Sequence, residues 1–295
     1  MKNKDTFEDV DFEETAMTLR KLIPEVTDLL SSEPALVYKD SEPVIIVGEL
    51  HGNSKALYLI IEEFEETDCS NIVFLGGYLD RENHSFELLK QLFELKIKYP
   101  DRVVLLQGRH ELANKNDGTD VELLSLLLEA FKKMPVAAIV NGSVFCINCG
   151  VPGGFGMNNL RKGEQSGLLS SDPFQYIKLL PPEMAKDSET FGRAVYEGFM
   201  YCYSWLKLIV QSHSSVPEGY KWWYDGKLLS IYSAPVQDKE DSFCGAFVVL
   251  KDGELTIYSF GDEDENGYHL TDVVRGPYWH LLYKNENNVN KEIKI

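Results

Sequence analysis

The chain has 295 residues, of which 44% are hydrophobic, enough to bury the core of one large domain or two small ones. Its 47 acidic and 29 basic side chains give a formal net charge of −18, which argues against a nucleic-acid partner, because phosphate backbones attract Lys and Arg. No run approaches the roughly 20 apolar residues that a membrane span needs, so we expect no membrane contact. The first five residues precede no apolar core, and the five cysteines indicate reduced thiols, so we expect a cytoplasmic or nuclear protein.

The first half of the chain predicts helices and short buried strands. Residues 11–31 have helical spacing, with a kink or restart expected at Pro24. A unit of strand, glycine loop and helix then occurs three times, which favours parallel strands in an α/β layout. The strands are expected at 44–47, 72–75 and 103–106, and the helices at 54–64, 86–98 and 121–133.

The second half is richer in strand-forming residues. Residues 152–193 contain many turn formers and predict a loop and helix region, which interrupts a series of strands. The strands are expected at 137–140, 144–147, 228–233, 245–250 and 255–260. No linker rich in Pro, Gly or Ser divides the chain, which favours one main domain. We assign this domain to residues 36–262, an N-terminal helical segment to 1–35 and a C-terminal extension or tail to 263–295.

Four short segments carry the polar residues of a candidate site. Three of them directly follow predicted strands, where open α/β sheets place their ligand sites. The four segments are 48–52 (GELHG), 76–81 (GGYLDR), 108–111 (GRHE) and 211–213 (QSH), the last followed by 232–235 (YSAP).

The chain resembles the PPP-type serine/threonine protein phosphatases between residues 36 and 260. The first three segments are similar, in order and spacing, to the family motifs G-D-x-H-G, G-D-x-x-D-R-G and G-N-H-E. Residues 212–220 and 232–235 are similar to its R-A/S-H-x-x-x-x-G-Y and F-S-A-P-N-Y segments. The resemblance implies an α/β (α+β) fold of the metallophosphoesterase type, a central β-sandwich flanked by helices, with a metal site at one edge.

Several functional positions of that family are retained here. In such sites two metal ions about 3.5–4 Å apart hold the attacking and leaving oxygens and make hydroxide available near neutral pH. The resemblance implies metal-ligand positions at Glu49, His51 and His213, a catalytic His110 oriented by Asp80, and a phosphate-binding Arg81.

Three other ligand positions have changed. Gly77 stands at the bridging aspartate, Arg109 at the asparagine ligand, and Asn148 at the histidine of the H-G-G motif. A guanidinium stays protonated in proteins and, at ~4 Å and an effective dielectric near 20, repels each unit of positive charge by about 4 kcal/mol. One hypothesis is therefore that Glu49 and Arg109 pair in the vacated metal site.

We interpret this pattern as a pseudophosphatase, a catalytically impaired phosphatase-like protein that binds or scaffolds other proteins. We expect no cofactor, or at most one weakly bound Mn, Fe or Zn ion. The expected partners are regulatory or scaffold proteins, with basic or phosphorylated peptides as further candidates. Two alternatives stay open: a serine/threonine phosphoprotein phosphatase with weak or altered metal-dependent activity, and a phosphate reader that uses Arg81 and Arg109.

Overall fold

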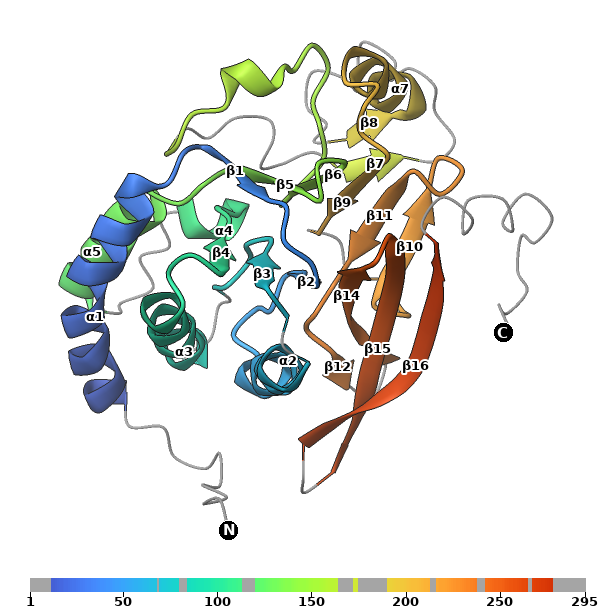
Figure 1. Cartoon of the computed structure of the whole chain (residues 1–295). Helices are drawn as coiled ribbons and strands as arrows, with labels where there is room; N and C mark the ends of the chain where they lie inside the picture. The colour runs from blue at the N-terminus through green and yellow to red at the C-terminus, as the bar shows by residue number, and fades with distance from the viewer. Residues whose placement is uncertain are drawn as a thin grey trace.

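The structure is a computed structural model that describes most of the chain. The described residues are 12–67, 69–79, 84–112, 120–163, 172–174, 190–212, 216–237, 242–264 and 267–277. Two six-stranded mixed sheets form a sandwich with helices against its outer faces (Figure 1). This architecture confirms the predicted fold class. None of the helices in these ranges is long and apolar enough to cross a membrane.

The first sheet has the order β16-β15-β14-β2-β3-β4. The strands β2, β3 and β4 are parallel, as the three predicted strand–helix units require, and the other three strands are antiparallel. The strands are β2 (Val44–Val47), β3 (Asn71–Phe74), β4 (Val103–Leu105), β14 (Gly245–Lys251), β15 (Glu254–Asp264) and β16 (Gly267–Pro277).

The second sheet has the order β1-β5-β6-β9-β11-β10. Within it β6, β9 and β11 run parallel, so their carboxyl ends lie at one edge. Its strands are β1 (Leu36–Lys39), β5 (Ala137–Val140), β6 (Val144–Ile147), β9 (Leu208–Gln211), β10 (Tyr220–Trp223) and β11 (Leu228–Ile231). Two small ladders pair β7 (Asp172–Phe174) with β8 (Thr190–Gly192), and β12 (Val236–Gln237) with β13 (Ser242–Phe243).

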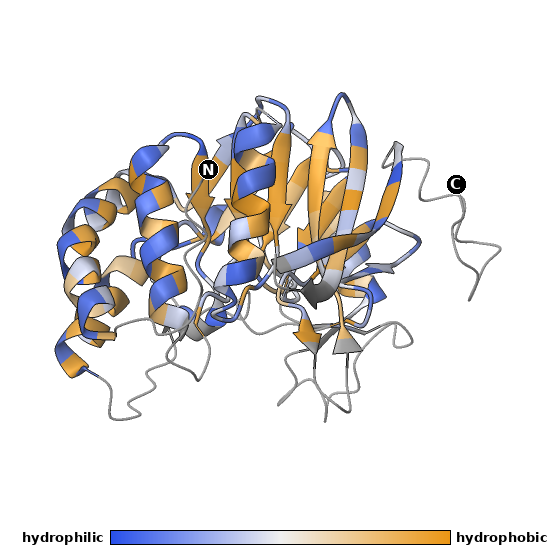
Figure 2. Cartoon of the chain, turned by 90° about the horizontal axis from the view of Figure 1, so that it is seen from below, coloured by the Kyte–Doolittle hydropathy of each residue, from blue (hydrophilic) through white to orange (hydrophobic). Residues whose placement is uncertain are grey.

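Both faces of the first sheet are buried at β2, β3 and β4, which explains why these strands are continuously apolar. In β2, Val44 and Ile46 belong to the core between the two sheets, whereas Ile45 and Val47 belong to the core under the helices. Figure 2 shows the result: the inner strands are largely hydrophobic and the helices have one hydrophilic face. The helices are α1 (Phe12–Ser32), α2 (Ser54–Glu66), α3 (His84–Lys98), α4 (Arg109–Leu112), α5 (Val121–Phe131) and α7 (Arg193–Cys202), with a 3₁₀ turn η1 (Met157–Asn159).

The N-terminal helix α1 packs into the main core. It continues through Pro24, where the sequence predicts a kink or restart, and it buries Leu19 and Val26 against the same cluster as α3 and α5. The buried ammonium group of Lys96 in α3 donates to Glu33, just past the end of α1, at 2.6 Å. The N-terminal helical segment is therefore held to the sandwich by apolar packing and by an ion pair.

Some strands were not predicted. β1, β9 and β10 are absent from the prediction, and β16 lies in the segment predicted as a C-terminal extension. β16 is paired with β15 from Gly267 to Pro277, with two register shifts. A strand at the outer edge thus completes the first sheet.

Candidate functional site

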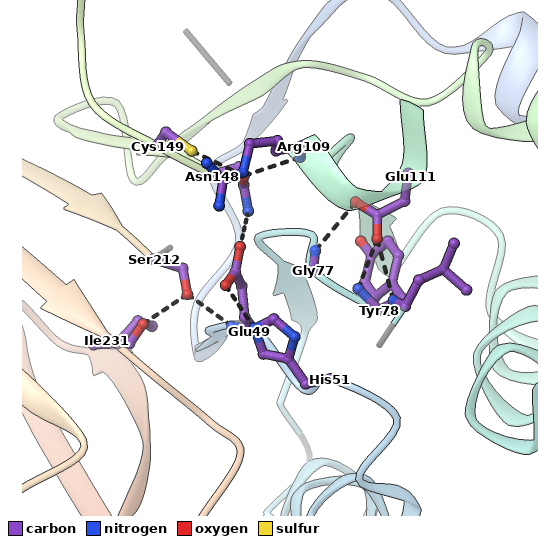
Figure 3. Close-up of polar contacts among 11 residues, drawn as sticks. Glu49, His51, Gly77, Tyr78, Arg109, Glu111, Asn148, Cys149, Ser212 and Ile231 are labelled. Carbon is purple, nitrogen blue, oxygen red and sulfur yellow. Dashed lines mark hydrogen bonds and ion pairs between the residues drawn. The ribbon is translucent and has the colours of Figure 1, made fainter. Parts of the chain in front are cut away.

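The carboxyl ends of strands from both sheets meet at one place (Figure 3). Glu49 follows β2 and forms an isolated parallel bridge with Tyr232, which follows β11. The sheets approach closely here, because a Cβ atom added at Gly48 would lie 2.5 Å from the carbonyl oxygen of Ile231. The other residues at this edge are Gly76 and Gly77 after β3, Arg109 after β4, Asn148 after β6, and Ser212 after β9.

Backbone hydrogen bonds join the first two loops. The N–H groups of Leu50 and His51 donate to the carbonyl of Gly77 at 3.2 and 2.9 Å, and Gly52 donates to Tyr78 at 3.1 Å. His51 has a φ of 44° and Gly77 a φ of 68°, both in the left-handed region. The loop conformation therefore fixes where residue 49 points its side chain.

Glu49 lies at the centre of the site. Its side chain is fully buried, and its two carboxylate oxygens have different partners. Oε2 lies 2.9 Å from Nε2 of His51, and Oε1 accepts a hydrogen bond from Nδ2 of Asn148 at 3.0 Å. The charge of this buried carboxylate is thus compensated by polar contacts, as burial of a charge requires.

The orientation of the Asn148 carboxamide follows from its other partners. Its Oδ1 accepts from the backbone N–H of Arg109 at 3.3 Å and from the thiol of Cys149 at 3.1 Å. Because donors surround Oδ1, the NH₂ group must be the end that faces Glu49. Asn148 therefore presents an N–H donor, and not a lone pair, to the centre of the site.

A second buried carboxylate, that of Glu111, holds the loop after β3. Its Oε1 accepts from the backbone N–H groups of Tyr78 at 2.7 Å and Leu79 at 3.4 Å, and its Oε2 accepts from Gly77 at 3.2 Å. Burial raises the pKa of Glu111, the hydrogen bonds oppose that shift, and the nearby charge of Glu49 adds to it. Glu111 acts on the site by positioning its backbone.

The structure brings together five of the predicted site residues: Glu49, His51, Gly77, Arg109 and Asn148. For His110 it describes only the backbone, at the start of α4, whereas Asp80, Arg81 and His213 lie outside the described residues. The proposed Glu49–Arg109 pair stays a prediction, although Asn148 contacts the side chain of one and the backbone of the other.

Sequence reasoning missed the roles of Glu111 and of the hydroxyl of Ser212, which accepts from the N–H of Glu49 at 2.7 Å. For Glu111 the available signal was a carboxylate directly after a strand–glycine loop. For Ser212 the sequence holds no such signal, because a serine after a strand has many uses.

Comparisons with known proteins agree with this fold. Residues 42–263 match the family described as calcineurin-like phosphoesterase. A serine/threonine phosphatase structure from Saccharomyces cerevisiae, described as similar to human phosphatase PP5, is similar with a TM-score of 0.67. It shares 19% identity, over 91% of this chain and 92% of that one. A cold-active protein-tyrosine phosphatase from a Shewanella species has a TM-score of 0.55 at 15% identity, over 83% and 84% of the two chains.

Proposed function

This chain belongs to the calcineurin-like phosphoesterase family, and we propose that it is a pseudophosphatase: it keeps the phosphatase fold and uses it to bind other proteins. The two-metal centre of this fold requires a bridging carboxylate and further oxygen or nitrogen lone pairs. The donor set described here does not fit that requirement.

The observation that carries the proposal is the hydrogen bond from Asn148 to Glu49. An NH₂ group is a donor and cannot ligate a metal ion, and its orientation is fixed by the two contacts of Oδ1. Gly77 adds no side chain at the bridging position. Glu49 and His51 are left as the two metal-binding side chains among these residues, and they are bonded to one another.

Arg109 supports the same proposal through its charge. It is half-buried at the start of α4, next to Asn148, and its guanidinium carries a positive charge. A divalent ion at ~4 Å from the guanidinium would be repelled by about 4 kcal/mol per unit charge at an effective dielectric of 20.

The test is metal analysis of the purified protein after incubation with Mn²⁺, Fe²⁺ or Zn²⁺, with phosphopeptide hydrolysis measured in parallel. We expect well below one ion per chain and no turnover. Near-stoichiometric metal, together with turnover that is abolished in His51→Ala, would overturn the proposal.

One contact favours a second candidate, a phosphatase with weak activity and one metal ion. Nε2 of His51 and Oε2 of Glu49 converge to 2.9 Å, so one divalent ion could replace the proton between them. His110 would then be the candidate acid. Activity on a phosphopeptide panel that is lost in His110→Ala, and retained in a variant of the exposed Glu254, would support this candidate.

The proposed partners are regulatory or scaffold proteins with basic segments. The formal net charge of −18 supports this choice, because an acidic surface attracts basic peptides and repels phosphorylated ones. A phosphate reader that uses Arg81 and Arg109 remains the competing proposal.

A further inference from the structure

Glu49 and Gly77 compete for the same space. A Cβ atom built on Gly77 would lie 2.2 Å from Cγ of Glu49, 2.5 Å from Cδ and 2.7 Å from Cβ. Real Cβ atoms essentially never approach other heavy atoms within 3.0 Å. The volume into which a side chain at position 77 would extend is therefore filled by the stem of Glu49.

Glu49 cannot easily move aside. Its side chain is fully buried, its two oxygens contact His51 and Asn148, and its backbone N–H is bonded to Ser212. The clash also involves Cβ and Cγ, which are close to the backbone, so rotation of the carboxylate alone would not relieve it. Displacing the stem would leave the NH₂ group of Asn148 buried without its acceptor, which is costly.

We infer that Glu49 is a built-in occupant of the centre and that Gly77 is the residue that Glu49 requires. This inference rests on the proposed function. Glu49 takes up the space in which a bridging carboxylate from position 77 would lie. Residues 49 and 77 therefore form a matched pair, and a side chain on 77 is incompatible with the present conformation of Glu49.

The inference predicts that the effect of a side chain at position 77 depends on residue 49. Unfolding equilibria would be measured for the wild type, Gly77→Ala, Glu49→Asp and the double variant. In the wild-type background we expect Gly77→Ala to shift the unfolding constant by at least about 100-fold, because the clash adds to the left-handed backbone cost. In the Glu49→Asp background Cβ and Cγ remain, so we expect most of that shift to persist.

Glu49→Ala removes Cγ and Cδ, and Glu49→Gly also removes Cβ. We expect the shift caused by Gly77→Ala to fall clearly in the alanine background and to approach about 10-fold, the backbone cost alone, in the glycine background. Gly219 supplies the matched control, since its φ of 78° resembles that of Gly77 and its Cβ atom would meet the backbone of Gly245 at 2.6 Å. Gly219→Ala should cost the same whether residue 49 is glutamate, aspartate or alanine.

Equal costs of Gly77→Ala in the wild-type, Glu49→Ala and Glu49→Gly backgrounds would overturn the inference. That result would say nothing about metal content or turnover. Conversely, bound metal and phosphatase activity would refute the proposed function and leave the measured coupling between residues 49 and 77 unchanged.

Discussion

The hydroxyl of Ser212 accepts a hydrogen bond from the backbone N–H of Glu49 at 2.7 Å and donates its own proton to the carbonyl of Ile231 at 2.8 Å. Ser212 follows β9 of the second sheet, whereas Glu49 follows β2 of the first. Ser233 makes a similar link, accepting from Gly48 at 2.8 Å and donating to Ala246 at 2.6 Å. Two serine hydroxyls thus hold the first loop of the site against the opposite sheet.

Ser212→Ala should destabilise the protein clearly. The change removes the partners of two buried backbone groups, and each unsatisfied buried group costs about 1–3 kcal/mol. Denaturant unfolding measures the effect. The control is Ser31→Ala, an exposed hydroxyl at the end of α1, for which a change within about 0.5 kcal/mol is expected. Similar small effects of the two substitutions would contradict the role assigned to Ser212.

Asn148→Asp should destabilise more than Asn148→Ala at pH 7. The aspartate would place a second carboxylate about 3 Å from Oε1 of Glu49, which costs about 5 kcal/mol at an effective dielectric near 20 when both are ionised. One proton shared between the two carboxylates relieves this repulsion. The difference in unfolding free energy between Asn148→Asp and Asn148→Ala should therefore shrink as the pH falls toward 4. A pH series of unfolding curves tests this, and a gap that does not change with pH would contradict it.

Glu111 should contribute to the stability of the fold in a way that depends on pH. Burial raises the pKa of this carboxyl above its ordinary value of 4.5. Between that value and the folded-state pKa, the folded chain holds a proton that the unfolded chain has lost. The contribution is therefore fully present below pH 4.5 and declines as the pH rises through the folded-state pKa.

The measurement is the free energy of unfolding of the wild type minus that of Glu111→Gln, followed from pH 4 upward. We expect this difference to fall with rising pH. The same difference for the exposed Glu254→Gln serves as the control. A difference that rises with pH would show that the backbone N–H groups dominate over burial.

Restoring the family ligands should restore metal binding. The variant with Glu49→Asp, Gly77→Asp, Arg109→Asn and Asn148→His should bind Mn²⁺ at least about 100-fold more tightly than the same variant that keeps Arg109, because it removes a repulsion of about 4 kcal/mol per unit charge. Titration calorimetry measures both. Equal affinities would show that Arg109 does not oppose the ion.

Binding of a Lys- and Arg-rich peptide should weaken with salt. The expected loss is several-fold between about 0.1 M and 1 M NaCl, as the Debye length falls from about 10 Å to about 3 Å. Fluorescence anisotropy with an acidic peptide of equal length as the control checks this. Tighter binding of a phosphopeptide, weakened by Arg81→Ala, would favour the phosphate reader instead.

The three parallel strands of the first sheet are completely buried, and the sequence predicts them well. β2, β3 and β4 are apolar on both faces and end at glycine loops, so hydropathy and turn formers locate them. β16 was missed because most of its side chains are exposed and only Val274 is buried among those whose burial is described. An edge strand of this kind depends on its pairing with β15, which hydropathy does not encode.

At the site, the sequence predicts which residues meet but not how they contact one another. The loops after parallel strands bring Glu49, Gly77 and Asn148 to one edge, as the motif order indicates. The direction of the Asn148 carboxamide depends on Cys149 and on the Arg109 backbone, and the path of the Glu49 side chain depends on the space at Gly77. Both are products of tertiary packing.

The position of α1 has a practical consequence for anyone who expresses a fragment of this protein. A fragment trimmed to the family match, residues 42–263, would lack α1, β1 and β16. It would uncover the apolar face of α3 and α5 and remove the carboxylate of Glu33, the ion-pair partner of Lys96. The packed elements extend beyond the residues that match the family at both ends.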